Sequence, residues 1–336
     1  MERIVPAGDW VVGIDVGGTG IRLAVAPGGW PADLSGARLR ALAEPARIAV
    51  GGHDAQALLT RLLPALDALA AGLPPGARIG AVAVGATGMA LLGRGLAAGL
   101  PAPLARATGA DRLVLAGDAV TAHVGALGRR PGVAVAAGTG LVAIGLHPAT
   151  GWHRADGWGQ LLGDCGSGGW IGRAGLEAAL RAYDGRTGGS AALLASAEHR
   201  YGPVTGLPGA LQPRPDRAAL LAAFAPDVVD AADGGCPVAG AIVRRAGEEI
   251  ADAAAAAARS AGLSAPQVAL TGGLFALARL REAALAALGD RLPAARPHHP
   301  DGPPLLGALR LAASVTGAAL PWPLDPPLLD VHTMVG

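Results

Sequence analysis

Two stretches of this chain repeat one local pattern, in which two short apolar runs flank a turn rich in glycine. The first stretch covers residues 10–26 and has the turn VGGTG between the runs WVVGID and IRLAVA. The second covers residues 133–146 and has the turn GTG between VAVAA and LVAIGL. Apolar runs of this length on either side of glycine predict β-hairpins. A similar hairpin in each half of the chain indicates an internally duplicated fold.

The remaining patterns complete an α/β arrangement. Further strands are expected at 47–50, 79–84 and 112–116, and leucines at helical spacing predict a helix over 53–71. Pro64 lies inside that helix and favours a kink or a break. With a helix at 118–127, the first half has the order β-β-β-α-β-α-β. In the second half we expect helices at 170–183, 237–261 and 304–313 and a strand at 267–271.

A length of 336 residues favours two domains, since a domain usually has roughly 150 residues. We expect a first domain over 1–117 and a second over 118–303, with a helical elaboration at about 184–236. A closing helix at 304–320 is expected to pack back on the first domain.

The composition excludes several kinds of chemistry. All 27 basic residues are arginine, and the chain has neither lysine nor asparagine, a bias typical of GC-rich genomes. A Walker-type phosphate loop needs a lysine, and the protein-kinase fold needs both residues, so neither nucleotide-binding machine is present. Schiff-base catalysis is excluded for the same reason. A net charge of +1 without a basic block argues against nucleic-acid binding.

Nothing in the sequence predicts a membrane span or a secretory signal. The long uncharged run 260–278 contains Pro266 and the pair Gly272 and Gly273, which a membrane helix rarely tolerates. The first residues, MERIVPAGDW, lack an apolar signal region. Cys165 and Cys236 do not form a zinc or disulfide pattern, and the histidines show no metal-ligand spacing. We therefore expect a cytoplasmic protein without a membrane partner.

The two glycine turns are candidates for phosphate binding. Consecutive glycines expose backbone N–H groups to phosphate oxygens, and Asp15 at the end of the first strand is placed to hold Mg²⁺ through water. The first turn contains Gly17, Gly18 and Thr19, and the second contains Gly138, Thr139 and Gly140. Either turn alone is also compatible with an ordinary hairpin. Together they predict a clamp on the β and γ phosphates of ATP that needs no lysine.

Asp118 directly follows the strand RLVLA. One interpretation is that it caps the following helix, a position that favours aspartate. The other is that it is catalytic, since α/β folds present their reactive groups at the carboxyl ends of strands. There its carboxylate would accept a hydroxyl proton as phosphoryl transfer begins.

Two further segments are candidates for binding rings. The segment 156–173, DGWGQLLGDCGSGGWIGR, combines Trp158 and Asp164 with many glycines, which favours a sugar pocket. It is equally compatible with a glycine loop that Ser167 caps before a helix. The segment LTGGLF at 270–275 contains Gly272 and Gly273, and such a turn lets an adenine ring lie against the backbone.

The ordered set of motifs resembles the N-acetylglucosamine kinase branch of the actin/hexokinase superfamily. This branch is grouped with the activator ATPases of benzoyl-CoA reductase and 2-hydroxyglutaryl-CoA dehydratase. The matching segments are DVGGT at 15–19, LAGDA at 115–119, GTG at 138–140, GWGQLLGDCGSGGWIGR at 157–173, LTGGLF at 270–275 and PLLGALRLA at 304–312. The resemblance implies two ribonuclease-H-like domains that close over a cleft, with Mg-ATP between them, and a homodimer.

The resemblance also implies roles for individual residues. Asp118 falls on the catalytic base, and Trp158, Asp164 and Gly88 of the segment GATG fall on the sugar pocket. Gly272 and Gly273 match the adenosine motif. Cys165 stands where family members carry Glu, and the segment APGGWPADL after the second strand lacks the Asn that often reaches the sugar. DVGGT followed by Arg22 is closer to the repressor/open-reading-frame (ROK) sugar kinases.

The expected function is ATP-dependent phosphorylation of an amino sugar at its 6-hydroxyl. N-acetylglucosamine and glucosamine are the expected substrates, and the sequence leaves N-acetylmuramate or another hexose open. Two alternatives belong to other classes. One is an ATPase that activates a redox enzyme, and the other is a catalytically silent sugar sensor.

Overall fold

The computed structural model describes residues 9–18, 20–42, 48–49, 52–88, 94–214, 216–316 and 320–333. The chain separates into two compact units. Unit 1 consists of Met1–Pro131, Leu146–Trp152 and His299–Gly336, and unit 2 of Gly132–Gly145 and His153–His298. The first boundary follows Pro131, not residue 117 as expected from the sequence. The helix at 118–127 stays in unit 1 because it packs against a helix from the end of the chain.

Unit 1 contains a six-stranded mixed sheet of order β13-β7-β6-β1-β2-β3. Its strands are β1 (Asp9–Gly17), β2 (Gly20–Pro27), β3 (Arg38–Leu42), β6 (Arg78–Ala86), β7 (Arg112–Gly117) and β13 (Leu329–Thr333). The central strands β1, β6 and β7 are parallel, and the others run antiparallel to their neighbours. β1 is buried from Val11 to Val16, as expected for a strand covered on both faces.

The third strand of this sheet is β3, whereas the sequence predicted a third strand at 47–50. β3 has the sequence RLRAL and is largely exposed, so it lacks the apolar run that identifies a buried strand. Ile48–Ala49 instead form the two-residue strand β4, which pairs with β5 (Gly52–His53) outside the main sheet.

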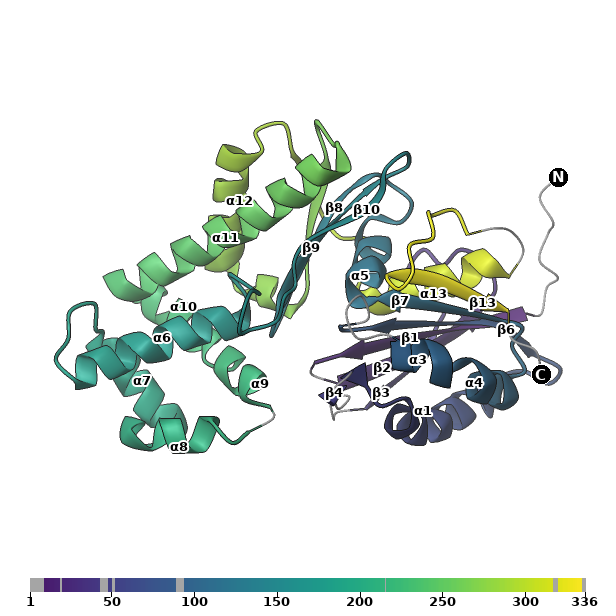
Figure 1. The fold of residues 1–336 in the computed structure, drawn as a ribbon, viewed down its shortest axis with the longest axis horizontal. Coiled ribbons are helices and arrows are strands. Elements are labelled where there is room, and N and C mark those ends of the chain that lie inside the picture. Colours follow the sequence, from purple (N-terminus) through teal and green to yellow (C-terminus); the bar gives the residue numbers. More distant parts are fainter. Residues whose placement is uncertain are drawn as a thin grey trace. The chain divides into compact units, whose positions relative to one another are not determined.

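Helices cover both faces of the sheet (Figure 1). One face is covered by α5 (Asp118–Leu127) and α13 (Pro304–Val315), and the other by α1 (Ala55–Ala70), α3 (Arg94–Gly99) and α4 (Pro101–Thr108). α1 continues through Pro64 as one helix, so the break considered from the sequence does not occur. Glycine lets α13 approach closely. A Cβ atom on Gly13 would lie 2.8 Å from the backbone nitrogen of Leu309, and one on Gly307 would lie 1.9 Å from the carbonyl oxygen of Thr121.

Unit 2 contains a five-stranded sheet of order β10-β9-β8-β11-β12. Its strands are β8 (Gly132–Ala137), β9 (Leu141–His147), β10 (Gly151–Asp156), β11 (Gln267–Thr271) and β12 (Arg296–His298). β8, β11 and β12 are parallel. The three residues between β8 and β9 form the second glycine turn identified in the sequence.

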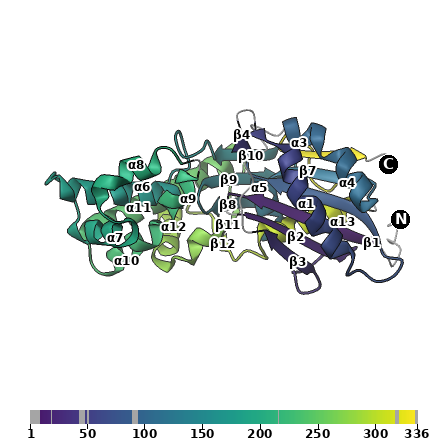
Figure 2. The same ribbon diagram turned by 90° about the horizontal axis from the view of Figure 1, so that it is seen from below.

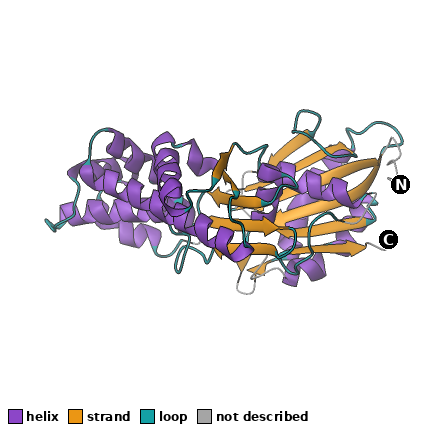
Figure 3. Cartoon of the chain, turned by 90° about the horizontal axis from the view of Figure 1, so that it is seen from above, coloured by secondary structure: helices purple, strands orange, loops and turns teal. Residues whose placement is uncertain are grey.

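Most of unit 2 is helical (Figures 2 and 3). Its helices are α6 (Gly168–Tyr183), α7 (Ala191–Tyr201), α8 (Leu207–Leu211), α9 (Arg217–Ala222), α10 (Ala225–Asp233), α11 (Pro237–Ala261) and α12 (Ala278–Arg291), with 3-10 turns η1 (Val204–Gly206) and η2 (Gly273–Ala276). The small side chains of the 25-residue α11 permit close packing on the sheet, since a Cβ atom on Gly145 of β9 would lie 2.8 Å from the carbonyl oxygen of Ala257. In the described part of the chain, no helix combines the length and apolar character that crossing a membrane would require.

Candidate active site

The carboxyl edge of β1, β6 and β7 brings two acidic residues together. Asp15 lies opposite Gly85 of β6, and Gly85 lies opposite Ala116 of β7. Asp118 follows Ala116 by two positions and begins α5. Since parallel strands end at the same edge of a sheet, this register places Asp15 and Asp118 near each other. The two carboxyl groups are close enough for the charge of Asp118 to act on Asp15.

The alternation of side chains along β1 decides which face Asp15 occupies. Val12 and Ile14 belong to the hydrophobic core that includes the leucines of α1. Gly13 lies against Leu309 of α13 on the opposite face. Because side chains in a strand point to alternate faces, Asp15 shares the face of Gly13, on which α5 and α13 pack.

Asp118 is held by two hydrogen bonds. The hydroxyl of Thr87 donates to its Oδ2 at 2.8 Å, and the backbone N–H of Ala119 donates to its Oδ1 at 2.9 Å. The side chain is partly buried. Asp118 is the first residue of α5, and Gly117 is the N-cap. The interpretation that Asp118 is the N-cap is therefore wrong by one residue. A carboxylate in the first turn is still favoured by the helix dipole.

Thr87 is the residue that sequence reasoning missed. It follows β6, and its backbone N–H donates to the carbonyl of Val16 at 3.0 Å, which ties this turn to the end of β1. The segment GATG was singled out as a pocket loop, but nothing in a single sequence shows that the Thr87 hydroxyl bonds to Asp118. Gly88 follows directly and has φ 73°, a conformation that glycine adopts without strain.

Asp15 is a buried carboxyl group with a perturbed pKa. Its residue is only 5% exposed. The pKa of Asp15 is raised to about 6. Burial is the largest cause, Arg22 acts to lower the pKa, and the charge of Asp118 acts to raise it. The nearest Arg22 nitrogen, Nη1, lies 3.5 Å from Asp15 Oδ2. A buried carboxylate beside a second carboxylate is the oxygen-rich, negatively charged environment that Mg²⁺ prefers.

The first glycine turn joins β1 to β2. Gly17 pairs with Gly20 at the end of the hairpin, and a Cβ atom on Gly18 would meet nothing within 4 Å. The backbone around Gly18 is therefore open to a ligand. Thr19 lies outside the described residues.

The second glycine turn is tied to the start of α6. The N–H groups of Gly168 and Gly169 donate to the carbonyls of Gly138 and Thr139, at 2.9 and 3.1 Å. Ser167 is the N-cap, and its Oγ accepts from the N–H of Trp170 at 3.2 Å. This confirms the expectation that Ser167 caps the helix. A Cβ atom on Gly138 would meet nothing within 4 Å, so this turn is also open.

The loop before α6 is organised by Asp156. Its Oδ1 accepts from the N–H of Asp164 at 2.7 Å, and its Oδ2 accepts from the N–H of Cys165 at 2.9 Å. Asp164 in turn accepts from the N–H of Gly159 at 3.2 Å. Both aspartates have positive φ, 58° at Asp156 and 55° at Asp164. Non-glycine residues held in this region often mark functional loops.

Asp164 and Trp158 are placed differently within this loop. A Cβ atom on Gly140 would lie 2.6 Å from Oδ2 of Asp164, so Asp164 lies directly beside the second glycine turn. Trp158 is 58% exposed, and the Arg154 guanidinium carbon lies 4.5 Å from its ring centroid. Leu161 and Leu162 are also exposed. The loop thus presents apolar side chains outward and a carboxylate toward the turn.

Gly272 and Gly273 differ in what surrounds them. Gly272 has φ 104°, and a Cβ atom there would lie 2.2 Å from the carbonyl oxygen of Ala137 at the end of β8. Gly272 is therefore required for packing beside the second glycine turn. A Cβ atom on Gly273 would meet nothing within 4 Å, which leaves its backbone accessible.

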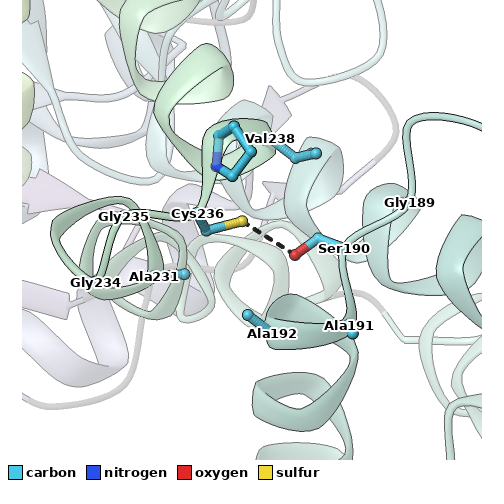
Figure 4. Close-up of a pocket in the computed structure, with 10 residues that line it drawn as sticks. Gly189, Ser190, Ala191, Ala192, Ala231, Gly234, Gly235, Cys236 and Val238 are labelled. Atoms are coloured by element: carbon cyan, nitrogen blue, oxygen red, sulfur yellow. Dashed lines mark hydrogen bonds between the residues drawn. The ribbon is translucent and has the colours of Figure 1, made fainter.

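The two cysteines have different environments. Burial is the main reason why the pKa of the Cys165 thiol lies above its ordinary value. Cys236 precedes α11 and lines a cavity of about 470 Å³ with Ser190, whose Oγ lies 3.2 Å from its Sγ (Figure 4). Burial acts to raise the pKa of Cys236, but hydrogen bonding to Ser190 and to backbone N–H groups outweighs it, and the net pKa is lowered. None of the predicted site residues lines this cavity.

Among the described residues, no group of three or more His, Cys, Asp or Glu side chains is arranged to hold a metal ion. His123 is fully buried and makes an edge contact with Trp152, with ring centroids 5.3 Å apart, so it is a packing residue.

Each unit contains its own cluster of predicted residues. Asp15, Gly18, Gly88 and Asp118 lie in unit 1, and Gly138–Gly140, Asp164 and Gly272 lie in unit 2.

Comparison with known proteins shows the family of this chain. Residues 12–312 match the profile of the BadF/BadG/BcrA/BcrD ATPase family. The chain belongs to this family. A curated relative of this BadF/BadG/BcrA/BcrD family member is the N-acetylmuramic acid/N-acetylglucosamine kinase of Clostridium acetobutylicum, which is 36% identical over 75 residues. That match covers 22% of the chain and only 24% of the kinase.

Solved structures confirm the fold class. A candidate N-acetylglucosamine kinase from Chromobacterium violaceum is 29% identical, with a TM-score of 0.68, over 90% of this chain and 99% of that one. A ROK family glucokinase from Streptomyces griseus, solved with glucose and AMPPNP, is 19% identical, with a TM-score of 0.55, over 90% of this chain and 99% of that one. This BadF/BadG/BcrA/BcrD family member therefore has the two-domain α/β fold of actin-like ATPases and sugar kinases, as the resemblance implied.

Proposed function

We propose that the protein is an ATP-dependent sugar kinase with Asp118 as its general base. The observation that carries this proposal is the position of Asp118 at the carboxyl edge of three parallel strands, fixed by Thr87 and Ala119 and close to Asp15. A general base must present an oriented carboxylate to the hydroxyl that it deprotonates. Both oxygens of Asp118 have a hydrogen-bond donor that fixes their direction.

An amino sugar is the substrate that the relatives favour. The Clostridium acetobutylicum relative is named for N-acetylmuramic acid and N-acetylglucosamine, and the Chromobacterium violaceum structure is named for N-acetylglucosamine. N-acetylglucosamine or glucosamine, phosphorylated at the 6-hydroxyl, is accordingly the first substrate to test. Trp158, Asp164 and Gly88 are the proposed sugar contacts.

The reaction follows from the roles of these residues. The sugar hydroxyl gives its proton to Asp118 as its oxygen forms a bond to the γ-phosphorus of ATP. The bond between that phosphorus and the bridging oxygen breaks, and ADP leaves. Thr87 holds the Asp118 carboxylate in place and is a positioning residue.

The glycine turns are the proposed sites of the nucleotide. The open backbones of Gly18 and Gly138 let phosphate oxygens reach N–H groups directly, as anion-binding turns do. Gly17, Thr19, Thr139 and Gly140 complete the two turns, and Gly272 and Gly273 are the proposed adenosine contacts. Preorganised N–H donors stabilise the charge on the transferring phosphoryl group.

Asp15 is the residue proposed to hold Mg²⁺ through a water molecule. The fit rests on its buried carboxyl group, whose pKa is raised by burial and by the neighbouring Asp118. When bound, Mg²⁺ neutralises negative charge on the β and γ phosphate oxygens. Above a pH of about 6 the Asp15 carboxylate is ionised and able to accept the hydrated cation.

The decisive experiment is coupled ADP release with Mg-ATP. The panel contains N-acetylglucosamine, glucosamine, N-acetylmuramate, N-acetylmannosamine and glucose, with a no-sugar control. Asp118→Asn is expected to lower turnover by ~10²-fold or more because the base is removed. Asp111→Asn makes the same chemical change at the other end of β7, where Asp111 forms an exposed ion pair with Arg78, and is expected to leave turnover unchanged.

Each other outcome supports a different function. ATP hydrolysis that does not depend on sugar favours an activator ATPase, a role compatible with the family assignment. Sugar binding without ADP release favours a silent sensor. Turnover of Asp118→Asn within a few-fold of wild type would remove Asp118 from the mechanism.

The homodimer stays a prediction, and analytical ultracentrifugation of the full chain tests it.

A further inference from the structure

Unit 1 has a cavity of its own at the opposite end of α5 from Asp118. It has a volume of about 360 Å³ and is lined by Trp30, Arg129, Arg130, Asp301 and Arg310, among others. α5 has ten residues, and a helix rises 1.5 Å per residue, so this cavity lies about 15 Å from Asp118. A volume of this size is within the range of small-molecule sites.

The charged side chains in this cavity are mainly basic. Three guanidinium groups line it, and Asp301 is the one carboxylate among its lining residues, which leaves a formal charge of +2. The Oδ2 atom of Asp301 lies 2.6 Å from Arg130 Nη2 and 3.4 Å from Arg310 Nη1, so one carboxylate is shared by two cations. Within the described ranges, no carboxylate pairs with Arg129.

Arg310 forms the fixed floor of the cavity. It is 3% exposed, and its Nη1 donates to the carbonyls of Val124 and Gly125 in the last turn of α5 at 3.0 and 3.1 Å. Its Nε and Nη2 donate to the carbonyls of Pro31 and Ala32. Burial is the main cause that lowers the pKa of Arg310, and the nearby charge of Arg130 lowers it further. These bonds make Arg310 a structural cation. Of the other two guanidinium groups, Arg130 pairs with Asp301 through Nη2, and Arg129 lies over the Trp30 ring.

Trp30 adds an aromatic surface at the same place. Trp30 is 41% exposed, although its side chain is large and apolar. The Arg129 and Arg310 guanidinium carbons lie 4.7 and 5.2 Å from its ring centroid. Trp322 packs against it with ring centroids 5.9 Å apart, which fixes its orientation. A fixed indole ring beside guanidinium groups suits a ligand that combines a ring with an anion.

We propose that this cavity binds a phosphate monoester whose ring-shaped body lies against Trp30 and whose phosphate is held by Arg129 and Arg130. The formal charge of the cavity favours a phosphate monoester over a carboxylate. A phosphate monoester carries about −1.5 to −2 at pH 7, which matches the formal +2 of the cavity better than a single carboxylate does. Arginine is also well suited to bind phosphate through two parallel N–H donors.

The test uses phenyl phosphate as the probe, with inorganic phosphate and benzoate as comparators, in isothermal titration calorimetry of the full chain. Saturating AMPPNP and Mg²⁺ are present to occupy the proposed nucleotide site. Phenyl phosphate is expected to bind with a Kd below about 1 mM, inorganic phosphate more weakly, and benzoate weakest. Arg129→Ala and Arg130→Ala are each expected to raise the Kd for phenyl phosphate by about 10-fold, since each removes a charge-assisted hydrogen bond.

Two further variants separate this site from other anion sites. Trp30→Ala is expected to weaken phenyl phosphate by about 10-fold and inorganic phosphate by less, because the stacking of Arg129 is lost for both ligands but the ring contact only for phenyl phosphate. Arg106→Ala removes an arginine from the last turn of α4 and is expected to have no effect. The absence of phenyl phosphate binding, or equal binding by wild type, Arg129→Ala and Arg130→Ala, would overturn the proposal. Preferential binding of benzoate would assign the cavity to carboxylates and contradict it as well.

Discussion

The contact between Thr87 and Asp118 is the single hydrogen bond on which the proposed chemistry depends most. A hydrogen bond to a charged group contributes about 1.5–3 kcal/mol, and each 1.4 kcal/mol lost from the transition state lowers the rate about 10-fold. Thr87→Val keeps the side-chain shape and removes the donor. We expect kcat to fall by about 10-fold or more, with a smaller change in the KM for sugar.

The controls for Thr87 separate positioning from folding. Thr87→Ser keeps the hydroxyl and is expected to retain most of the activity. Thr60→Val removes a hydroxyl that bonds to Gln56 in the exposed part of α1, and should behave as wild type. The acidic limb of the kcat pH profile is expected to move to higher pH in Thr87→Val, because the ionised carboxylate loses a donor. An unchanged profile with unchanged kcat would show that Thr87 does not orient Asp118.

Asp15 makes the stability of the protein depend on pH. In the folded, metal-free protein its pKa is about 6, against an ordinary value of 3.8. The folded state therefore holds this proton more tightly than the unfolded state. The resulting stabilisation is complete below about pH 3.8 and is lost as pH rises through about 6. A difference of about two pKa units corresponds to about 3 kcal/mol.

Asp15→Asn tests this linkage. The amide does not titrate, so the free energy of unfolding of the variant, relative to wild type, is expected to rise by about 2 kcal/mol between pH 4.5 and pH 7.5, the part of the linkage that falls in this window. Chemical denaturation at the two pH values, without Mg²⁺, measures it. The exposed Asp111→Asn serves as the control and should show no such trend. A difference between Asp15→Asn and wild type that is independent of pH would contradict the raised pKa.

At the scale of elements, glycine determines how closely α13 packs against α5. Gly307 of α13 faces the Thr121 carbonyl, and Gly125 of α5 faces Pro303, whose carbonyl oxygen would lie 2.4 Å from an added Cβ atom. Both contacts involve backbone atoms, which cannot move aside as a flexible side chain does. The two helices are therefore held at a separation that only glycine permits.

Gly307→Ala is expected to destabilise unit 1 by about 3 kcal/mol, because the added methyl group forces α5 and α13 apart. Gly240→Ala in α11 is the matched control. A Cβ atom there meets nothing within 4 Å, so alanine should leave stability unchanged or raise it by up to about 1 kcal/mol. Thermal unfolding followed by circular dichroism measures both. If Gly307→Ala unfolds at the wild-type temperature, α13 does not pack as described.

At the scale of the whole molecule, the two units have separate hydrophobic cores. Unit 1 is nevertheless assembled from three separate stretches of the chain, the last of which begins at His299. α13 in that last stretch buries Leu305, Leu306, Leu309 and Leu311. Each buried leucine contributes about 1.5–3 kcal/mol, or about 6–12 kcal/mol together. This is comparable to the total stability of a typical domain.

A chain that ends at His298 is therefore expected to lose the fold of unit 1. The sheet face that carries Asp15 and Gly13 would be uncovered, and we expect aggregation or binding of a hydrophobic dye. A chain that ends at Thr316 keeps α13 and removes the edge strand β13, and is expected to stay folded with lower stability. A soluble His298-terminated chain with one cooperative transition of wild-type midpoint would contradict this account.

Much of the fold and part of the candidate site could be predicted from local patterns. The two glycine turns, the strands β1, β2, β6 and β7 and the helices α5 and α11 all lie close to their predicted positions, because each has a strong apolar period or a glycine signal. β3, β10, β12 and β13 were missed. They are short or polar and are strands only because a neighbouring strand pairs with them.

The sequence by itself determined that Asp15 lies near the end of one strand of an α/β fold, that Asp118 directly follows another, and that a glycine turn follows Asp15. These properties depend on a few neighbouring residues and on the alternation of side chains. Only the tertiary structure decided that Thr87 bonds to Asp118, that burial raises the pKa of Asp15 and that α5 belongs to unit 1. It also decided that the Arg129 and Arg310 guanidinium groups lie over the Trp30 ring. These contacts join residues far apart in the chain, such as Pro31 and Arg310, and their energies come from packing and desolvation, which no local pattern contains.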